Sequence, residues 1–223
     1  MAARAARSAA RAPLSRERVL RAAIELADTD GVDALTMRRL GQALGVEAMS
    51  LYNHVANKGD VLAGMVDVLV GDIPTVAPGP DWRAALRAQA MGARSVVVRH
   101  AWAPALILSR RSMSAALTRY MDGATGLMLE GGLSADLVHN AMHVLGSRLL
   151  GFTQELFDTG DLGPELAGIL RDLDAATYSN IAAVLREIHH DDDDEFAFGL
   201  DLVLDGLERL RVPGGDGRDA TVA

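Results

Sequence analysis

Apolar residues recur at intervals of three and four along almost the whole chain, and this spacing is the feature that most restricts its fold. The interval matches the turn of an α-helix, whereas the strict alternation of apolar and polar residues that is typical of a half-buried strand is absent. Because 49% of the residues are hydrophobic, helices of this kind can bury a core. We therefore expect an all-α protein.

Capping residues and helix breakers indicate where the helices begin and end. Ser15, Thr36 and Asn57 are of residue types that accept hydrogen bonds from the first turn of a helix. Gly31 and Gly45 suit the positive φ at which many helices end. These and similar breaks predict helices over residues 16–30, 36–44, 47–54, 58–73, 82–99, 104–111, 113–130, 134–157, 164–189 and 195–211.

A proline-rich segment from Pro74 to Pro80 divides the chain. Proline lacks a backbone donor and clashes with the preceding turn, so no helix continues through this segment. We expect one domain over residues 14–73 and a second over residues 80–211. Residues 1–13 are expected to form a basic flexible arm, and residues 212–223 a flexible tail.

The net charge of −8 comes entirely from the second part of the chain. Residues 1–73 contain 9 basic and 9 acidic residues, whereas residues 74–223 contain 13 basic and 21 acidic ones. Binding to DNA depends on positive charge gathered on one face rather than on the total charge. The charge therefore leaves open a DNA-binding role for the first domain.

Several classes of protein are disfavoured by what the sequence contains. Without cysteine there are no disulfides, no Cys-ligated zinc and no thiol nucleophile. Apolar runs fall far short of the roughly 18 residues that span a bilayer. A Gly-rich phosphate loop, a nucleophile elbow and a carboxylate–histidine metal motif are also missing. We expect a soluble, cytoplasmic protein that is not an enzyme, uses no cofactor or metal and does not enter a membrane.

The most informative stretch runs from Leu35 to Lys58 and predicts two short helices joined by a glycine turn. Gly41 falls where the two helices would cross, and Gly45 supplies the turn between them. The apolar residues of the stretch are spaced to fill one small core with the first helix of the chain: Leu40, Leu44, Val46, Leu51 and Val55. This arrangement is a helix-turn-helix whose second helix faces outward.

The outward face of the second helix carries side chains that can contact phosphates, base edges or a thymine methyl group. These residues are Ala48, Met49, Ser50, Tyr52, Asn53 and His54. Thr36 and Lys58 begin the flanking helices, whose free N–H groups attract phosphate. The pattern predicts a DNA-binding surface.

Residues 14–73 resemble the DNA-binding domain of the TetR family of transcriptional repressors. The resemblance is carried by Leu35-Thr36, Arg38, Leu40, Leu44-Gly45-Val46, Leu51-Tyr52, His54-Val55 and Asn57-Lys58. It implies a homodimer with one helix-turn-helix per subunit and a ligand-sensing second domain. It further implies that Thr36, Tyr52, His54 and Lys58 contact phosphates. The positions that read or flank bases are then Arg38, Ala48, Met49, Ser50 and Asn53.

The second domain resembles the tetracycline-repressor subclass, through Trp82, Arg99-His100, Leu150-Gly151, Glu155 and Phe196 to Leu207. That subclass binds its drug as a magnesium chelate through a histidine, and the corresponding place here falls near Ile107. Tetracycline–magnesium is therefore not assumed as the ligand. We expect a small, largely apolar effector to contact Gln89, Trp102, Leu106, Met113, Met128, His143, Phe152 and Glu155.

Three other patterns leave alternatives open. His139 and His143 lie four residues apart on one helix face, which suits a metal, but a place in a dimer contact or a pocket wall is favoured. His189-His190 with the four aspartates that follow is interpreted as a solvated loop rather than a chelating tract. The methionines at positions 91, 113, 121, 128 and 142, with Trp82 and Trp102, line a pocket or belong to the core.

The sequence favours a ligand-responsive repressor that leaves a palindromic DNA operator when its effector binds. The homodimer would form through the helices near residues 134–157 and 195–211. The alternatives are a ligand-independent architectural protein or activator, which an absent cavity would support, and a helical enzyme fused to a DNA-binding module. Neither the effector nor the operator sequence follows from the residues.

Overall fold

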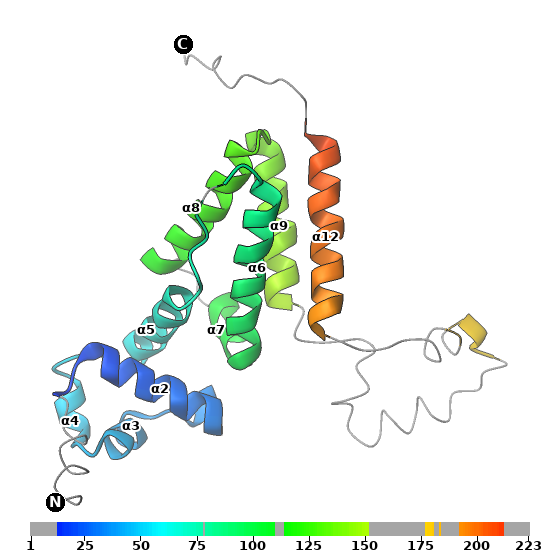
Figure 1. Ribbon diagram of the computed structural model, residues 1–223. Helices are drawn as coiled ribbons and strands as arrows, with labels where there is room; N and C mark the ends of the chain where they lie inside the picture. Colours follow the sequence, from blue (N-terminus) through cyan, green and yellow to red (C-terminus); the bar gives the residue numbers. More distant parts are fainter. Residues whose placement is uncertain are drawn as a thin grey trace, which may run out of the picture.

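The computed structural model describes residues 13–77, 79–109, 114–151, 177–180, 183 and 192–211, and over this part of the chain the regular structure is entirely helical (Figure 1). The all-α prediction is confirmed to that extent. The helices are α2 (Arg16–Asp30), the 3-10 turn η1 (Val32–Ala34), α3 (Met37–Leu44), α4 (Ala48–Leu51), α5 (Lys58–Gly71), α6 (Trp82–Arg99), α7 (Ala103–Ser109), α8 (Ala115–Glu130), α9 (Ala135–Gly151) and α12 (Asp192–Leu210).

The predicted N-caps of the first domain are confirmed. The Ser15 hydroxyl accepts from the backbone N–H of Arg18 at 3.2 Å, and the Thr36 hydroxyl accepts from that of Arg39 at 3.2 Å. The Asn57 side chain accepts from the N–H of Asp60 at 2.9 Å. Each cap satisfies a donor that the first turn of a helix leaves unpaired, and this fixes where α2, α3 and α5 begin.

Two helices differ from the prediction by three residues at one end. The α-helix expected over residues 47–54 covers only Ala48–Leu51, and the chain then tightens into a turn in which the His54 N–H donates to the Leu51 carbonyl. α12 begins at Asp192 rather than at residue 195, so the expected acidic loop is wrong for residues 192–194. Acidic residues are favourable in the first turn of a helix, and Arg94 pairs with Asp193. Of the helix expected over residues 164–189, the structure describes only residues 177–180 and 183, of which 179, 180 and 183 are helical. The end of the helix expected over residues 134–157, the arm over residues 1–12 and the tail over 212–223 lie outside the described residues.

The first hydrophobic core joins α2, α3, α4 and α5. Leu40, Leu51 and Val55 are buried, and Leu44 and Val46 pack against them, as the spacing predicts. The same core also takes in residues beyond the proline-rich segment, namely Val96 of α6 and Ala103 of α7, with Trp102 packed against it. The ends of α6 and α7 therefore pack directly on the helix-turn-helix domain.

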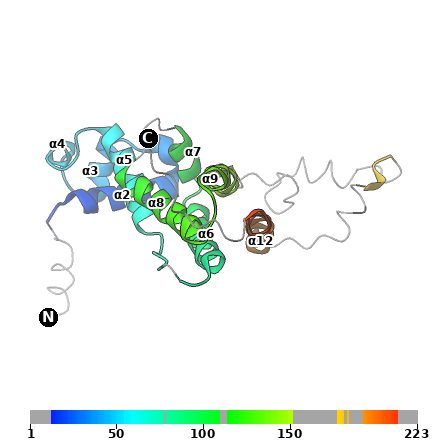
Figure 2. The same cartoon turned by 90° about the horizontal axis from the view of Figure 1, so that it is seen from above.

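The second core lies between α6, α8, α9 and α12 and is centred on Trp82, Leu86, Met128, Phe196 and Leu200. Polar contacts at its rim tie α6 to α12. The Trp82 Nε1–H donates to Glu208 at 3.2 Å, the Arg87 Nε–H donates to Asp201 at 2.7 Å, and Arg83 pairs with Asp205. In both views α12 lies at the opposite side of the molecule from α3 and α4 (Figures 1 and 2).

An ion pair between α2 and α5 holds the turn that follows α4. The Arg16 guanidinium donates to both oxygens of Asp60, at 2.6 and 2.8 Å, and to the His54 carbonyl at 3.2 Å. Asp60 also accepts from the Ala56 N–H at 2.8 Å. The hydrogen bonds from Arg16, followed by that from Ala56, lower the pKa of Asp60 from 3.8 to about 2.

Gly41 stands at the crossing of α3 and α4, as the sequence predicts. A Cβ at this position would lie 2.9 Å from the Val46 carbonyl oxygen and 3.1 Å from the Ala48 nitrogen. Both atoms belong to the backbone, so neither can turn aside. We expect Gly41→Ala to lower the free energy of unfolding by about 1–3 kcal/mol, as measured by urea denaturation.

The control for this change is Gly71→Ala at the end of α5, where nothing lies within 4 Å of the added Cβ. This variant should be as stable as the wild type or slightly more stable. Equal stability of the Gly41 and Gly71 variants would contradict the close crossing of α3 and α4.

The stabilisation from Asp60 should depend on pH. Because folding lowers its pKa, the contribution is present above the unfolded value near 3.8 and is lost as the pH falls through about 2. Asp60→Asn should therefore be less stable than the wild type at pH 6, and the difference should shrink between pH 4 and pH 2. Denaturation curves at pH 6, 4 and 2.5 measure it, with Asp33→Asn, an exposed carboxylate of the same domain, as the control. A difference that stays constant over this range would argue against the Arg16–Asp60 pair.

Candidate DNA-binding surface and ligand cavity

The residues expected to contact DNA lie on α3, on α4 with its following turn, and at the start of α5. Thr36, Arg38, Met49, Tyr52 and Asn53 are exposed, and Met49 and Tyr52 keep 76% and 45% of their surface accessible. The other predicted contacts are half-buried: Ala48, Ser50, His54 and Lys58. All nine are thus at least partly accessible on three consecutive helices.

The burial of two side chains four positions apart orients this surface. Leu51 is fully buried and Val55 almost so, which turns the neighbouring Met49, Tyr52 and Asn53 away from the core. A helix of four residues is not stable alone, so its position depends on that burial and on the contact between Arg16 and the His54 carbonyl. A polar, solvent-facing patch on a short anchored helix is suited to the major groove.

Sequence reasoning missed the residues that position the surface. Arg16 and Asp60 are 44 positions apart, and no local pattern connects them. Arg39 likewise pairs with Asp30 and donates to the Ala34 carbonyl at 3.2 Å, which ties α3 to the end of α2. The sequence shows that basic and acidic residues are mixed in these helices, but this is true of any solvated helix and does not say which residues pair.

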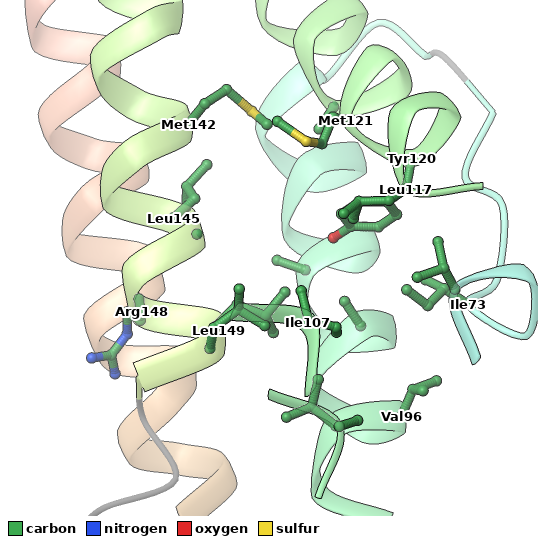
Figure 3. A pocket seen from close by; sticks show the side chains of 18 of the residues that line it. Ile73, Val96, Ile107, Leu117, Tyr120, Met121, Met142, Leu145, Arg148 and Leu149 are labelled. Carbon is green, nitrogen blue, oxygen red and sulfur yellow. The ribbon is translucent and has the colours of Figure 1, made fainter. Parts of the chain in front are cut away.

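A cavity of about 230 Å³ lies between α5 of the first domain and the helices of the second domain (Figure 3). α5, α6, α7, α8, α9 and α12 all contribute to its wall. Among the lining residues are Leu69, Ile73, Ile107, Met142, Leu145 and Leu149. Ile107 therefore faces the cavity.

Two of the lining side chains carry nitrogen or oxygen, those of Tyr120 and Arg148. The Tyr120 hydroxyl points into the space between Met121, Leu145 and Ile107, whereas the Arg148 guanidinium turns away toward α12 (Figure 3). Arg148 donates there to the carbonyls of Glu195 and Phe196, at 2.6 and 3.2 Å. The part of the cavity wall that the described residues form is therefore almost wholly apolar.

The predicted ligand contacts that the structure describes lie elsewhere than on this wall. Met128 is fully buried in the second core, and Gln89 is buried with its side chain donating to the Tyr120 carbonyl at 3.1 Å. Trp102 packs on the first core, and Leu106 is half-buried on α7. His143 lines a separate surface groove between α8 and α9. The remaining predicted contacts, Met113, Phe152 and Glu155, lie outside the described residues.

There is a geometric reason why two of the predicted ligand contacts do not line the cavity. Gln89 and Leu106 are direct neighbours of Ala90 and Ile107, which do line the cavity. An error of one residue turns a helical position by 100°, from the wall into the core or solvent. The sequence did not decide whether several methionines line a pocket or belong to the core. Met121 and Met142 line the cavity, and Met128 does not.

A carboxylate links the cavity helices to the DNA-binding domain. Asp28 of α2 accepts from the Trp102 indole N–H at 2.7 Å and lies 2.8 Å from the His100 Nδ1. Both rings belong to the segment between α6 and α7, directly before Ala103 and Ile107 of the cavity wall. The contact therefore ties the segment before α7 to α2.

The histidines of α9 do not belong to a larger cluster of metal-ligating side chains among the described residues. Within the described ranges no group of three or more histidine, cysteine or acidic side chains is placed to hold a metal ion. His139 and His143 meet edge to face, with ring centroids 4.7 Å apart. None of the helices in the described part is long and apolar enough to cross a bilayer.

Comparison with known proteins agrees with both halves of this arrangement. Residues 19–65 match the family model for bacterial regulatory proteins of the tetR family, and residues 74–211 match that for the tetracyclin repressor-like C-terminal domain. The chain is 34% identical over 220 residues to the class D tetracycline repressor protein of Escherichia coli, covering 92% of this chain and 96% of that protein.

Two further relatives come from Streptomyces. The HTH-type transcriptional repressor DrrR1 of Streptomyces coeruleorubidus is 29% identical over 211 residues, covering 88% of this chain and 78% of the relative. The TetR family protein ActR of Streptomyces coelicolor, in complex with actinorhodin, superposes with a TM-score of 0.73 at 26% identity and covers 90% of this chain and 99% of its own. The chain belongs to the TetR family of transcriptional regulators.

Proposed function

We propose that this regulator is a repressor that binds a palindromic operator as a homodimer and leaves it when a small, largely apolar molecule enters the cavity. The observation that carries the proposal is the course of α5. Its first residue, Lys58, lies at the DNA-binding surface, and its far end contributes Leu69 and Val70 to the cavity wall. One helix therefore connects the two sites.

The mechanism follows from this connection. A ligand that presses on Leu69 and Val70 displaces the far end of α5, and the Asp60–Arg16 pair passes the displacement to α2 and to the turn after α4. The contact of Asp28 with Trp102 gives a second route, through α7. The ligand acts only if it binds the displaced arrangement more tightly than the DNA-binding one.

The apolar wall supports an apolar ligand, and the existence of the cavity favours a ligand-responsive regulator over a ligand-independent architectural protein. Relatives named as repressors, DrrR1 and the tetracycline repressor of class D, support repression as the mode of action. The complex of ActR with actinorhodin is an example of a relative that binds an organic molecule.

A homodimer through α9 and α12 is supported by apolar residues on the outer side of α12. Phe198, Leu202 and Leu210 are 67%, 53% and 64% exposed, and with Gly206 they are spaced four residues apart along one helix face. Val144 of the neighbouring α9 is half exposed as well. A ridge of this spacing fits the groove of an identical helix. Two DNA-binding domains fixed in this way would meet half-sites about 34–36 Å apart, or a multiple of that distance.

Tyr52→Ala tests the DNA-binding surface. Tyr52 is exposed beside the buried Leu51, so its removal should leave the fold intact and cost a phosphate contact. Affinity for genomic fragments selected by the wild type should fall about tenfold at fixed salt, as measured by mobility shift. Leu129→Ala, an exposed apolar residue of α8, is the control and should bind as the wild type does. If Tyr52→Ala bound these fragments with undiminished affinity, the proposed DNA-binding surface would be incorrect.

Phe198→Asp combined with Leu202→Asp tests the dimer. Two carboxylates in an apolar contact lose hydration without gaining partners, so the dimer dissociation constant should rise more than about a hundredfold. Sedimentation velocity measures the change, and circular dichroism checks that the helices remain. Val98→Asp places one such carboxylate on an exposed apolar site of α6 and should stay dimeric. A dimeric double variant would direct the search to another face.

A further inference from the structure

Tyr120 is the residue of the cavity wall whose chemistry the proposed function does not yet use. It lies in α8, and Gln89 of α6 donates to its backbone carbonyl at 3.1 Å, which holds this part of α8 against α6. Its hydroxyl points into the cavity, toward the space enclosed by Leu145, Met121 and Ile107 (Figure 3). Within the described part of the chain, no residue accepts or donates a hydrogen bond at this hydroxyl.

This hydroxyl is available to form a hydrogen bond with a ligand. An apolar ligand that fills the cavity removes this hydroxyl from water, which costs free energy unless the ligand supplies a hydrogen bond. The neighbouring described side chains of the wall are hydrocarbon or thioether. Burial raises the pKa of Tyr120 to about 12, so the phenol keeps its proton at neutral pH. It therefore offers an O–H donor at a fixed place in an apolar space.

The other polar residue of the wall does not offer a comparable contact. Arg148 directs its guanidinium away from the cavity and onto the carbonyls of Glu195 and Phe196, and it also lies over the Phe196 ring, 5.2 Å from the ring centroid. Its positive charge therefore serves the packing of α9 on α12. This arrangement favours a neutral ligand over an anionic one.

We propose that the effector is a neutral, largely apolar molecule with a carbonyl oxygen that accepts a hydrogen bond from the Tyr120 hydroxyl. This inference depends on the proposed function, because it assigns the chemistry of the same cavity. A phenol donates better than it accepts, since the ring withdraws electron density from its oxygen. Tyr120 then selects among apolar molecules of equal shape by the presence and direction of one hydrogen bond.

Three tricyclic probes of nearly equal shape test this selection. Fluorene offers no hydrogen-bonding group, fluorenone offers a carbonyl acceptor, and carbazole offers an N–H donor. Equilibrium dialysis against the full-length protein measures their dissociation constants. We expect fluorenone to bind about fivefold more tightly than the other two, as one neutral hydrogen bond implies.

Two variants assign the preference to Tyr120. Tyr120→Phe removes only the hydroxyl and should abolish the advantage of fluorenone over fluorene. Tyr178→Phe makes the same change at an exposed tyrosine and should keep the advantage. Thermal denaturation without ligand checks that Tyr120→Phe is folded, and the ranking of the three probes on the wild type does not depend on any variant.

The outcomes separate this inference from the proposed function. Equal binding of the three probes, a preference for carbazole, or an advantage that survives in Tyr120→Phe would overturn the role of Tyr120 and leave an apolar ligand cavity standing. Failure of all three probes to bind the wild type would overturn both the inference and the use of the cavity. Binding to genomic fragments is measured separately and is unaffected by either result.

Discussion

The packing of α5 against α2 is the constraint on which both sites depend. Val61 and Met65 of α5 are fully buried in the first core, and Leu69 is buried there as well as at the cavity wall. Gly64 brings the two helices close together, since a Cβ on it would lie 2.6 Å from the Leu20 side chain. Interiors packed this tightly do not deform gradually. In the proposed mechanism, a shift of α5 at the cavity is therefore accompanied by a shift of α2 and of the candidate DNA-binding surface.

The parts of the fold that the sequence predicted correctly are those determined by neighbouring residues. Thr36 and Asn57 cap their helices because a side-chain oxygen reaches an N–H three positions on. Gly45 adopts a φ of 67°, which glycine reaches without steric cost. The burial of Leu51 beside the exposed Tyr52 follows from helical spacing. The helices that carry the candidate DNA-binding surface are determined largely by such local relations, so their positions follow from the sequence, and the DNA contacts themselves stay a prediction.

The cavity was predicted less well because its wall depends on which side of each helix faces inward, and contacts distant in sequence decide this. Arg94 and Arg148 both lie over the Phe196 ring and set the rotation of α12, although they are 102 and 48 positions from it. Asp28 and Trp102 are 74 positions apart. With nothing local to fix these rotations, sequence reasoning chose Leu106 where the structure turns Ile107 inward.

The orientation of α12, which these distant contacts determine, bears on the proposed regulation. Its inner side supplies Phe196 and Leu200 to the cavity wall, and its outer side presents Phe198 and Leu202. In the proposed dimer, the same helix therefore meets the ligand on one face and the partner on the other. The contacts of Arg94 and Arg148 attach α12 to α6 and α9. In the proposed mechanism α12 is therefore the fixed wall of the cavity, and a bound ligand displaces the part of the wall that contains the end of α5.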